Sequence, residues 1–119
     1  MTPGSKGGDH RIQKVRDMID HDPLVTRKQL EIKARLSRSR LDELFKRHVG
    51  IRLGDYIRAR RLKEAAKLLE TSEPNTSEPG IKEIAHRIGY KHSSSFVRSF
   101  KLFFGVSPSD YRRSHREKS

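Results

Sequence analysis

One pattern of residues occurs twice in this chain, and it restricts the folds that the chain can adopt. Each copy has Phe-Lys, a glycine four residues after the lysine, and Asp-Tyr beginning five residues after the glycine. The copies start at Phe45 and Phe100, so they lie 55 residues apart. A pattern repeated at a constant offset implies two related structural units.

The segment before the second copy has the pattern of a helix-turn-helix. It begins with Ile-Lys-Glu-Ile-Ala at 81–85, places Gly89 four residues after the alanine, and continues with three serines and Phe96. This order predicts a helix, a tight turn and a second helix, the motif whose second helix enters the major groove of DNA.

Apolar residues recur at helical spacing along the chain and predict an all-α fold of about seven helices. Thr26 and Ser37 have the side chains of N-caps, Gly105 is expected to end a helix, and Ser107 and Pro108 supply a cap and a first-turn proline for the last one. The expected helices cover residues 12–22, a segment after Thr26, a segment after Ser37, residues 53–70, 81–88 and 93–103, and a short segment after Ser107.

These helices group into two helix-turn-helix subdomains joined by a long helix. At 1.5 Å per residue, the helix from about Leu53 to Glu70 is roughly 25 Å long, which suits a strut between the two. The expected organisation is a flexible tail (1–10), a first lobe (11–52), a connecting helix (53–70), a Pro- and Glu-rich linker (71–80), a second lobe (81–113) and a basic tail (114–119).

The linker contains Thr-Ser-Glu-Pro twice, at 71–74 and 76–79. Its two prolines prevent a continuous helix, and the duplication lengthens the connection by several residues. One interpretation is a tolerated surface insertion, because loop length costs little free energy. The other is that the insertion loosens the second lobe and lets it accept altered spacing between half-sites.

The charge balance indicates a polyanionic partner. Lysines and arginines number 27 against 15 acidic residues, which gives a net charge of +12 and a pI near 10.5. Nucleic acid is the commonest soluble polyanion, although charge alone does not separate DNA from RNA or an anionic membrane. A hydrophobic fraction of 32% suits two small cores better than one deep core.

Other classes of function find no support in the sequence. The chain has no cysteine for disulfides or thiolate metal sites, its six histidines lack metal-ligand spacing, and no cofactor is expected. No phosphate-binding loop or nucleophile elbow occurs, so an enzyme is not expected. No run is long and apolar enough to span a membrane, and the start lacks a signal peptide, which predicts a cytoplasmic location.

The residues from Ile81 to Arg112 closely resemble the C-terminal DNA-binding half of AraC/XylS-type transcription regulators. The resemblance extends over about residues 24–113 and includes the Arg-Leu-x-x-Ala-x-x-Leu-Leu pattern at 61–69. It implies double-stranded DNA as partner, with two recognition helices in successive major grooves roughly 34 Å apart on an asymmetric site bound by one chain. It also implies a bacterial regulator at the nucleoid that acts with RNA polymerase, most often as an activator.

In the second lobe, Ser94, Ser95 and Arg98 are the candidates for base contacts. Phe96, Val97 and Phe100 are expected to take the buried face of the helix, which leaves the serines and the arginine for DNA. Arginine donates two hydrogen bonds to guanine, and it stands at the arginine of the family pattern Phe-x-x-Arg-x-Phe-Lys. The alternative is that Arg98 only neutralises a phosphate.

In the first lobe, the candidates are Arg38, Ser39 and Glu43, and here the chain departs from the family. Glu43 replaces an arginine; a carboxylate accepts from cytosine N4 but is repelled by phosphates. Glu31 stands where an alanine packs between the helices, and Arg35 where the turn has a glycine, so we expect a different turn geometry or a local cost. The alternative is a degenerate lobe that contacts only the DNA backbone.

Phosphate contacts are expected at helix starts and around the recognition helices, where hydroxyls and cations meet the backbone. For the two equivalent lysines the alternative is simple solvation. The candidates are Thr26, Arg40, Lys46, Arg47, Lys101 and Ser107.

Two wider questions stay open at this stage. An architectural protein that binds DNA or RNA without sequence preference is the second candidate function, although the low aromatic content of 7% argues against base stacking on single strands. Many members of the family carry an N-terminal ligand-binding domain, so the chain is expected to be a stand-alone regulator or a fragment with a linker remnant at its start.

Overall fold

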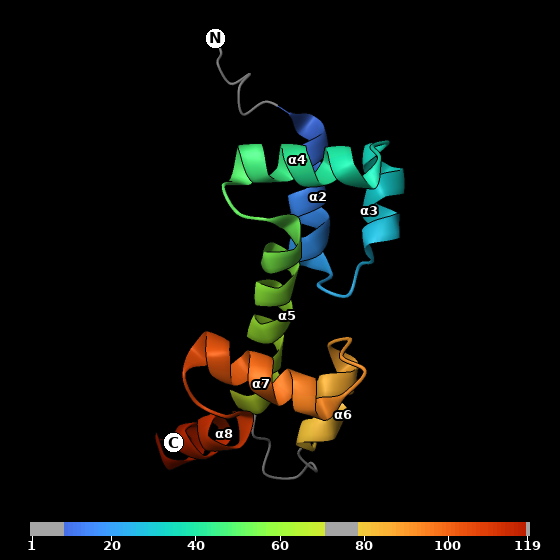
Figure 1. Ribbon diagram of the computed structural model, residues 1–119. Coiled ribbons are helices and arrows are strands. Elements are labelled where there is room, and N and C mark those ends of the chain that lie inside the picture. Colours follow the sequence, from blue (N-terminus) through green and yellow to red (C-terminus); the bar gives the residue numbers. More distant parts are fainter. Residues whose placement is uncertain (1–8, 71–78, 119) are drawn as a thin grey trace. The chain divides into compact units, whose positions relative to one another are not determined.

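The computed structural model describes residues 9–70 and 79–118, and every regular element among them is an α-helix (Figure 1). This confirms the all-α prediction and its count of seven helices within those residues. None of these helices is both long and apolar enough to cross a membrane. The helices are α2 (His10–His21), α3 (Arg27–Ala34), α4 (Arg38–Val49), α5 (Leu53–Glu70), α6 (Ile81–Arg87), α7 (Ser93–Phe104) and α8 (Pro108–Lys118).

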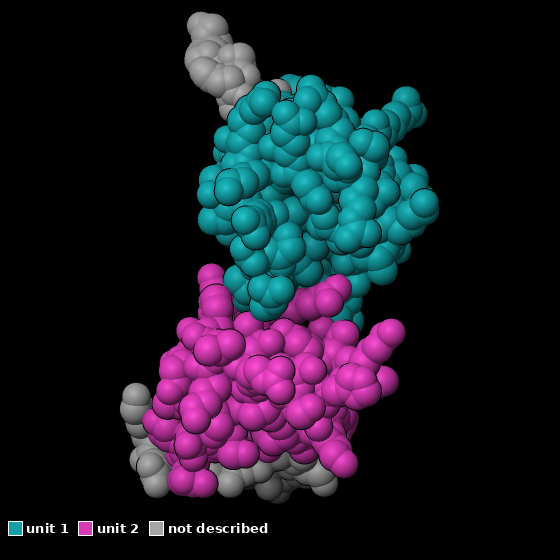
Figure 2. All heavy atoms as spheres, viewed as in Figure 1, with its two compact units in different colours: residues 1–60 teal, residues 61–119 magenta. Residues whose placement is uncertain are grey.

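The chain divides into two compact units (Figure 2). The division, between residues 60 and 61, falls inside α5. Unit 1 comprises residues 1–60 and unit 2 residues 61–119. Each unit has its own hydrophobic core, so the two halves of α5 belong to different cores. Most of the expected linker, residues 71–78, and the start of the expected tail, residues 1–8, lie outside the described residues.

The core of unit 1 forms where α2 contacts both α3 and α4, and the first turns of α5 complete it. Phe45 is fully buried at its centre, and its ring meets the edge of Tyr56 at 5.4 Å between centroids. Each helix contributes residues at helical spacing: Ile12, Val15 and Ile19; Leu30 and Ala34; Leu41, Leu44 and Phe45; Leu53 and Ile57.

The core of unit 2 has the same plan but more aromatic side chains. Phe96 and Phe100 of α7 are fully buried, with their ring centroids 5.7 Å apart. Phe104 and Tyr111 lie 4.5 Å and 5.4 Å from Phe100. The remaining core residues come from the second half of α5 and from α6 and the turn after it: Leu62, Ala65, Ala66, Leu69, Ile84, Ala85 and Ile88.

The second half of α5 does for unit 2 what α2 does for unit 1. The buried residues Ile12, Val15 and Ile19 of α2 correspond to Leu62, Ala65 and Leu69, each 50 residues later. The repeat therefore extends beyond the two Phe-Lys segments, with a shorter offset. The difference arises because five residues separate α2 from α3, whereas ten separate α5 from α6.

The helix ends follow the side chains that the sequence offers as caps. Thr26 accepts a hydrogen bond from the Gln29 amide at 3.1 Å, and the Gln29 side chain accepts from the Thr26 amide at 2.9 Å, which makes a capping box. Ser37 and Ser107 accept from the amides of Arg40 and Asp110 at 3.2 Å and 3.1 Å. These observations confirm all three predicted N-caps.

Gly50 and Gly105 end α4 and α7 in the left-handed conformation, with φ of 93° and 86°. A Cβ atom at either position would meet nothing within 4 Å. The requirement for glycine is therefore set by the backbone angle and not by crowding, because glycine adopts positive φ without steric strain.

The turn between α3 and α4 contains Arg35, whose φ of 57° and ψ of 45° are left-handed. The turn of unit 2 has Gly89 in the corresponding place, with φ of 92°. The turn of unit 1 thus keeps a left-handed residue, as in unit 2, and of the two expected outcomes this geometry supports a local cost, about 1–2 kcal/mol for an L-residue. Glu31 is half-buried, while Ala85, its counterpart in unit 2, is buried.

A tyrosine hydroxyl ties the last helix of each unit to the first. Tyr56 donates to the Asp20 carboxylate at 2.7 Å, and Tyr111 donates to the Glu70 carboxylate. Asp20 and Glu70 are themselves equivalent at the 50-residue offset.

The basic end expected at 114–119 is helical as far as Lys118, and His115 contacts both the ring and the carbonyl oxygen of Tyr111.

Candidate nucleic-acid interface

The outer face of α4 gathers six of the predicted DNA-contacting residues. The inner face of this helix is buried through Leu41, Leu44 and Phe45, so the residues between them point to solvent. The exposed residues include the three predicted base contacts and three of the predicted phosphate contacts: Arg38, Ser39, Arg40, Glu43, Lys46 and Arg47.

The outer face of α7 carries fewer charged residues than that of α4. Ser94, Arg98 and Lys101 are exposed, whereas Ser95 is half-buried. Phe96 and Phe100 occupy the buried face, as predicted, and Val97 is half-buried between the faces. The structure therefore brings Ser94, Ser95, Arg98 and Lys101 to one helix, with Ser95 the least accessible of them, whereas Ser107 lies outside it as the N-cap of α8.

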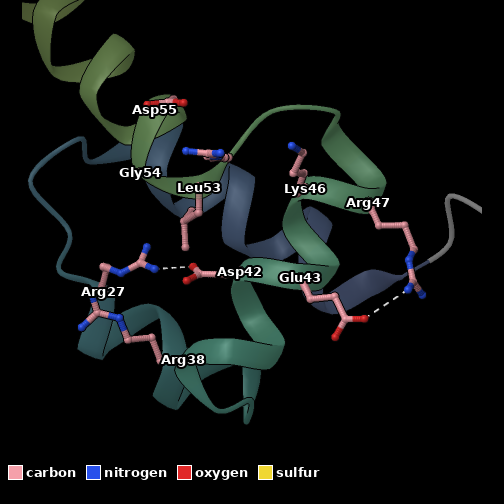
Figure 3. A pocket seen from close by; sticks show the side chains of 10 residues that line it. Arg27, Arg38, Asp42, Glu43, Lys46, Arg47, Leu53, Gly54 and Asp55 are labelled. Atoms are coloured by element: carbon pink, nitrogen blue, oxygen red, sulfur yellow. Dashed lines mark hydrogen bonds and ion pairs between the residues drawn. The ribbon is translucent and has the colours of Figure 1, made fainter.

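Glu43 is bound on both sides by arginines of its own helix. Its Oε1 accepts from Arg40 Nη1 at 3.0 Å and its Oε2 accepts from Arg47 Nη2 at 3.2 Å, the second of which Figure 3 shows. These partners stand three residues before and four residues after Glu43, on the same face of the helix. Both carboxylate oxygens therefore already hold a hydrogen bond.

A second ion pair joins α3 to α4. Arg27, the first residue of α3, donates through Nη2 to Asp42 Oδ1 (Figure 3). The Arg27 side chain is mostly buried, with 27% of its surface exposed. This pair fixes the start of α3 against α4. Neither residue is among the site candidates predicted from the sequence, which gives Arg27 only as part of the positive charge of the first lobe.

A hollow of about 750 Å³ opens beside α4 in unit 1 (Figure 3). Its walls come from the start of α3, the outer face of α4 and the first turn of α5. Because the first turn of a helix favours anions and the basic side chains outnumber the acidic ones, the hollow suits a phosphate group. Its charged residues are Arg27, Arg38, Lys46, Arg47 and Arg52, with Asp42, Glu43 and Asp55.

Unit 2 has a hollow of about 770 Å³ between α6 and the start of α7. Glu83 is paired with Arg87 at 2.6 Å within it. The sequence does not single out Arg52 in unit 1 or the basic residues of this hollow as candidates, because they lie in turns or on α6, outside α4 and α7. The residues of this hollow that can be positively charged are Lys82, His86, Arg87, Lys91 and His92.

Comparison with known proteins identifies the family. Residues 30–114 match the family model described as a helix-turn-helix domain. Over 110 residues the chain is 34% identical to the multiple antibiotic resistance protein MarA of Escherichia coli. This alignment covers 89% of the chain and 81% of MarA. The chain belongs to the AraC/XylS family of transcriptional regulators. Its members are DNA-binding regulators and not enzymes, and the same holds for this chain.

A further relative within the AraC/XylS family is the HTH-type transcriptional activator AarP of Providencia stuartii. The identity is 40% over 74 residues, which are 62% of this chain and 51% of AarP. The chain therefore aligns with about half the length of that relative.

Solved AraC/XylS-type domains share the fold. The C-terminal domain of the response regulator AraT from Geobacillus stearothermophilus has a TM-score of 0.72 and 30% identity, covering 87% of this chain and 84% of that domain. The DNA-binding domain of AdpA, solved in complex with a target DNA, has a TM-score of 0.77 and 24% identity. That match covers 91% of this chain and 95% of the AdpA domain.

Two of the hydroxyls predicted to contact phosphates have a structural task as well. Thr26 and Ser107 both accept the hydrogen bond of an N-cap, which leaves their O–H free to donate to a phosphate oxygen. Lys46 lines the hollow of unit 1, while its repeat equivalent Lys101 lies on the exposed face of α7. In this AraC/XylS-family chain, α4 of unit 1 therefore carries more basic and more acidic residues than α7 of unit 2.

Proposed function

We propose that this chain binds duplex DNA sequence-specifically through α4 and α7. The observation that carries the proposal is that each helix has an exposed face opposite a fully buried phenylalanine, Phe45 in α4 and Phe100 in α7. That face is polar in α4, and in α7 it carries Ser94, Arg98 and Lys101 together with the exposed Leu102. A recognition helix needs this division, because its exposed side must reach base edges while its other side holds it to the domain.

Base contacts come from Arg38 and Ser39 in unit 1 and from Ser94, Ser95 and Arg98 in unit 2. Arg98 is the main contributor, since an arginine on an exposed recognition helix can bind guanine O6 and N7 together. Glu43 lies on the same surface and acts there in association with Arg40 and Arg47. Because the residues of the two helices differ, the preferred site is asymmetric, with two blocks about one helical turn apart that one chain occupies.

Phosphate contacts surround these helices and fix their register without specifying sequence. The two hollows supply most of the positive charge, with Arg27 and Arg52 added to the predicted set in unit 1 and Lys82 and Lys91 in unit 2. The predicted contacts retained here are Thr26, Arg40, Lys46, Arg47, Lys101 and Ser107.

The chain acts as a transcriptional activator in the bacterial cytoplasm, at the nucleoid, with RNA polymerase as its protein partner. Support comes from the name of AarP as a transcriptional activator. A reporter gene placed behind the selected DNA site tests this part: expression that rises with the chain supports activation, and expression that falls identifies a repressor.

Selection of bound duplexes from a random pool at about physiological salt tests the whole proposal. Salt must be fixed because neutralising about six to ten phosphates changes the affinity roughly 10³- to 10⁵-fold between about 50 and 200 mM. Two enriched blocks about one turn apart support two-helix recognition. A single block restricts unit 1 to backbone contacts. The absence of enrichment moves the chain to the architectural class.

A further inference from the structure

The recognition helices of the two units differ most at one equivalent position. Glu43 of α4 corresponds to Arg98 of α7 at the 55-residue offset. The residues that flank Glu43 at three before and four after are arginines, Arg40 and Arg47, whereas the equivalents in α7 are Ser95 and Leu102. The three charged residues therefore form a set that exists only in unit 1.

The geometry of this set determines what its members can offer to DNA. Both oxygens of Glu43 accept from a guanidinium, at 3.0 Å and 3.2 Å. All three side chains are about half exposed or more, with 52% for Arg40, 50% for Glu43 and 63% for Arg47. The pairs therefore lie on the surface that would face the duplex and are not part of the core.

An N–H group that binds Glu43 cannot simultaneously make a full hydrogen bond to a phosphate. Each guanidinium keeps its other N–H donors, so Glu43 does not block a phosphate outright: it holds the arginine along the helix, offsets part of its charge and itself repels the phosphate. Exposed pairs at these spacings are weak, so Glu43 reduces the contribution of the arginines without abolishing it.

We propose that Glu43 is a positioning residue that holds Arg40 and Arg47 against α4 and thereby lowers the sequence-independent affinity of unit 1 for DNA. The inference rests on the proposed function, because it assumes that α4 faces a duplex. Its consequence is that unit 1 adds little sequence-independent binding, so that the total affinity for DNA depends more strongly on the contacts of unit 2.

The variant Glu43→Gln tests the inference, because glutamine keeps the shape of the side chain but loses its charge. Release of two helix-surface pairs corresponds to roughly two- to five-fold tighter binding. Each additional phosphate that the released arginines neutralise also steepens the dependence of log K on log salt by about 0.9. Since phosphates carry no sequence information, the selected site and a random duplex should tighten by the same factor.

Two further variants isolate the cause. Asp17→Asn changes the net charge by the same amount on the exposed surface of α2, outside the hollow, and should leave the salt dependence unchanged. In a chain that already carries Arg40→Ala and Arg47→Ala, the substitution Glu43→Gln should no longer steepen the salt dependence, because the arginines through which Glu43 acts are absent. Thermal melting of each variant verifies that it is folded.

Three results would overturn the inference. A Glu43→Gln chain that loses its preference at one base pair would make Glu43 a base contact. An unchanged salt dependence would show that the ion pairs do not compete with DNA. An increase in affinity that persists without Arg40 and Arg47 would reduce the effect to direct repulsion. A native chain that enriches no motif would instead contradict the proposed function, which keeps the two failures distinct.

Discussion

Units 1 and 2 share the same helix plan but place charge on α4 and α7 in different ways. Helix α4 carries four lysines and arginines with two acidic residues, whereas α7 carries two basic residues and no acidic one. The formal balance of the two helices is therefore the same. Equal net charge therefore does not make the two helices equivalent, because in α4 Glu43 pairs with Arg40 and Arg47, and Asp42 pairs with Arg27 of α3.

The cores differ as well, and their independence can be tested through the equivalent residues Phe45 and Phe100. Both are fully buried, so replacing either by alanine should destabilise its unit by about 3–5 kcal/mol. Amide hydrogen exchange measures which unit opens. If Phe45→Ala weakens protection in α2 to α4 alone, the units are separate folding entities; equal loss in α6 to α8 would contradict that separation.

The difference between Glu43 of α4 and its equivalent Arg98 of α7 can also be removed by a substitution in α7. Arg98→Glu gives α7 the acid of α4, and we expect it to cost at least about 1–3 kcal/mol of binding to the selected site, the value of a bidentate arginine–guanine contact. The measurement is affinity against a set of single base-pair changes. Preference should disappear at one position only.

A matched control for Arg98→Glu is Arg11→Glu, which makes the same charge reversal on the exposed surface of α2. It should weaken all duplexes slightly and equally. If Arg98→Glu behaved in that way too, Arg98 would be a phosphate contact, which is the alternative that the sequence left open.

Local signals in the sequence were sufficient for the framework of the fold but not for the site. Apolar spacing and the side chains of Thr26, Ser37 and Ser107 act within one turn of helix, so the helices and their caps could be predicted. The pair of Arg27 with Asp42 joins residues from two helices and depends on how α3 packs on α4. No spacing along the chain indicates it.

A different kind of omission concerns the arginines around Glu43. Their positions three before and four after the glutamate are visible in the sequence and fit helical ion pairs. The spacing alone does not decide whether these arginines bind Glu43 or DNA. The end of α8 also differs from expectation: His115 contacts Tyr111 one turn earlier, and the helix continues through most of the predicted basic tail, as far as Lys118.

The turns of the two units predict a pair of opposite effects. Arg35→Gly should stabilise the chain by about 0.5–1 kcal/mol, because it removes the cost of a left-handed L-residue, partly offset by the greater freedom of glycine when unfolded. Gly89→Ala should destabilise by about 1 kcal/mol or more, since its φ is 92°. Urea unfolding of both variants measures the difference. Equal signs would refute the assignment of strain to Arg35.

The smallest expected effect concerns the two tyrosines that tie the helices together. Burial, together with the hydrogen bond to Glu70 and its negative charge, raises the pKa of Tyr111 from 10.0 to about 12. Burial and Asp20 also raise the pKa of Tyr56, although Arg16 opposes the shift. Between pH 10 and about pH 12 the unfolded chain therefore releases a proton from Tyr111 that the folded chain keeps, so stability falls as the pH rises through this range.

Tyr111→Phe should remove that part of the alkaline loss, while Tyr56→Phe should remove a smaller part because its partner cation favours the ionised form. Comparing the urea midpoint of each variant with the native chain from about pH 9 to about pH 12 cancels the lysines, which titrate in the same range in all three proteins. If the urea midpoints of the native chain and the Tyr111→Phe chain fall in parallel as the pH rises, Tyr111 and its hydrogen bond to Glu70 do not cause the alkaline loss of stability. A larger effect for Tyr56 would reverse the comparison, since it would place the stronger helix tie in unit 1.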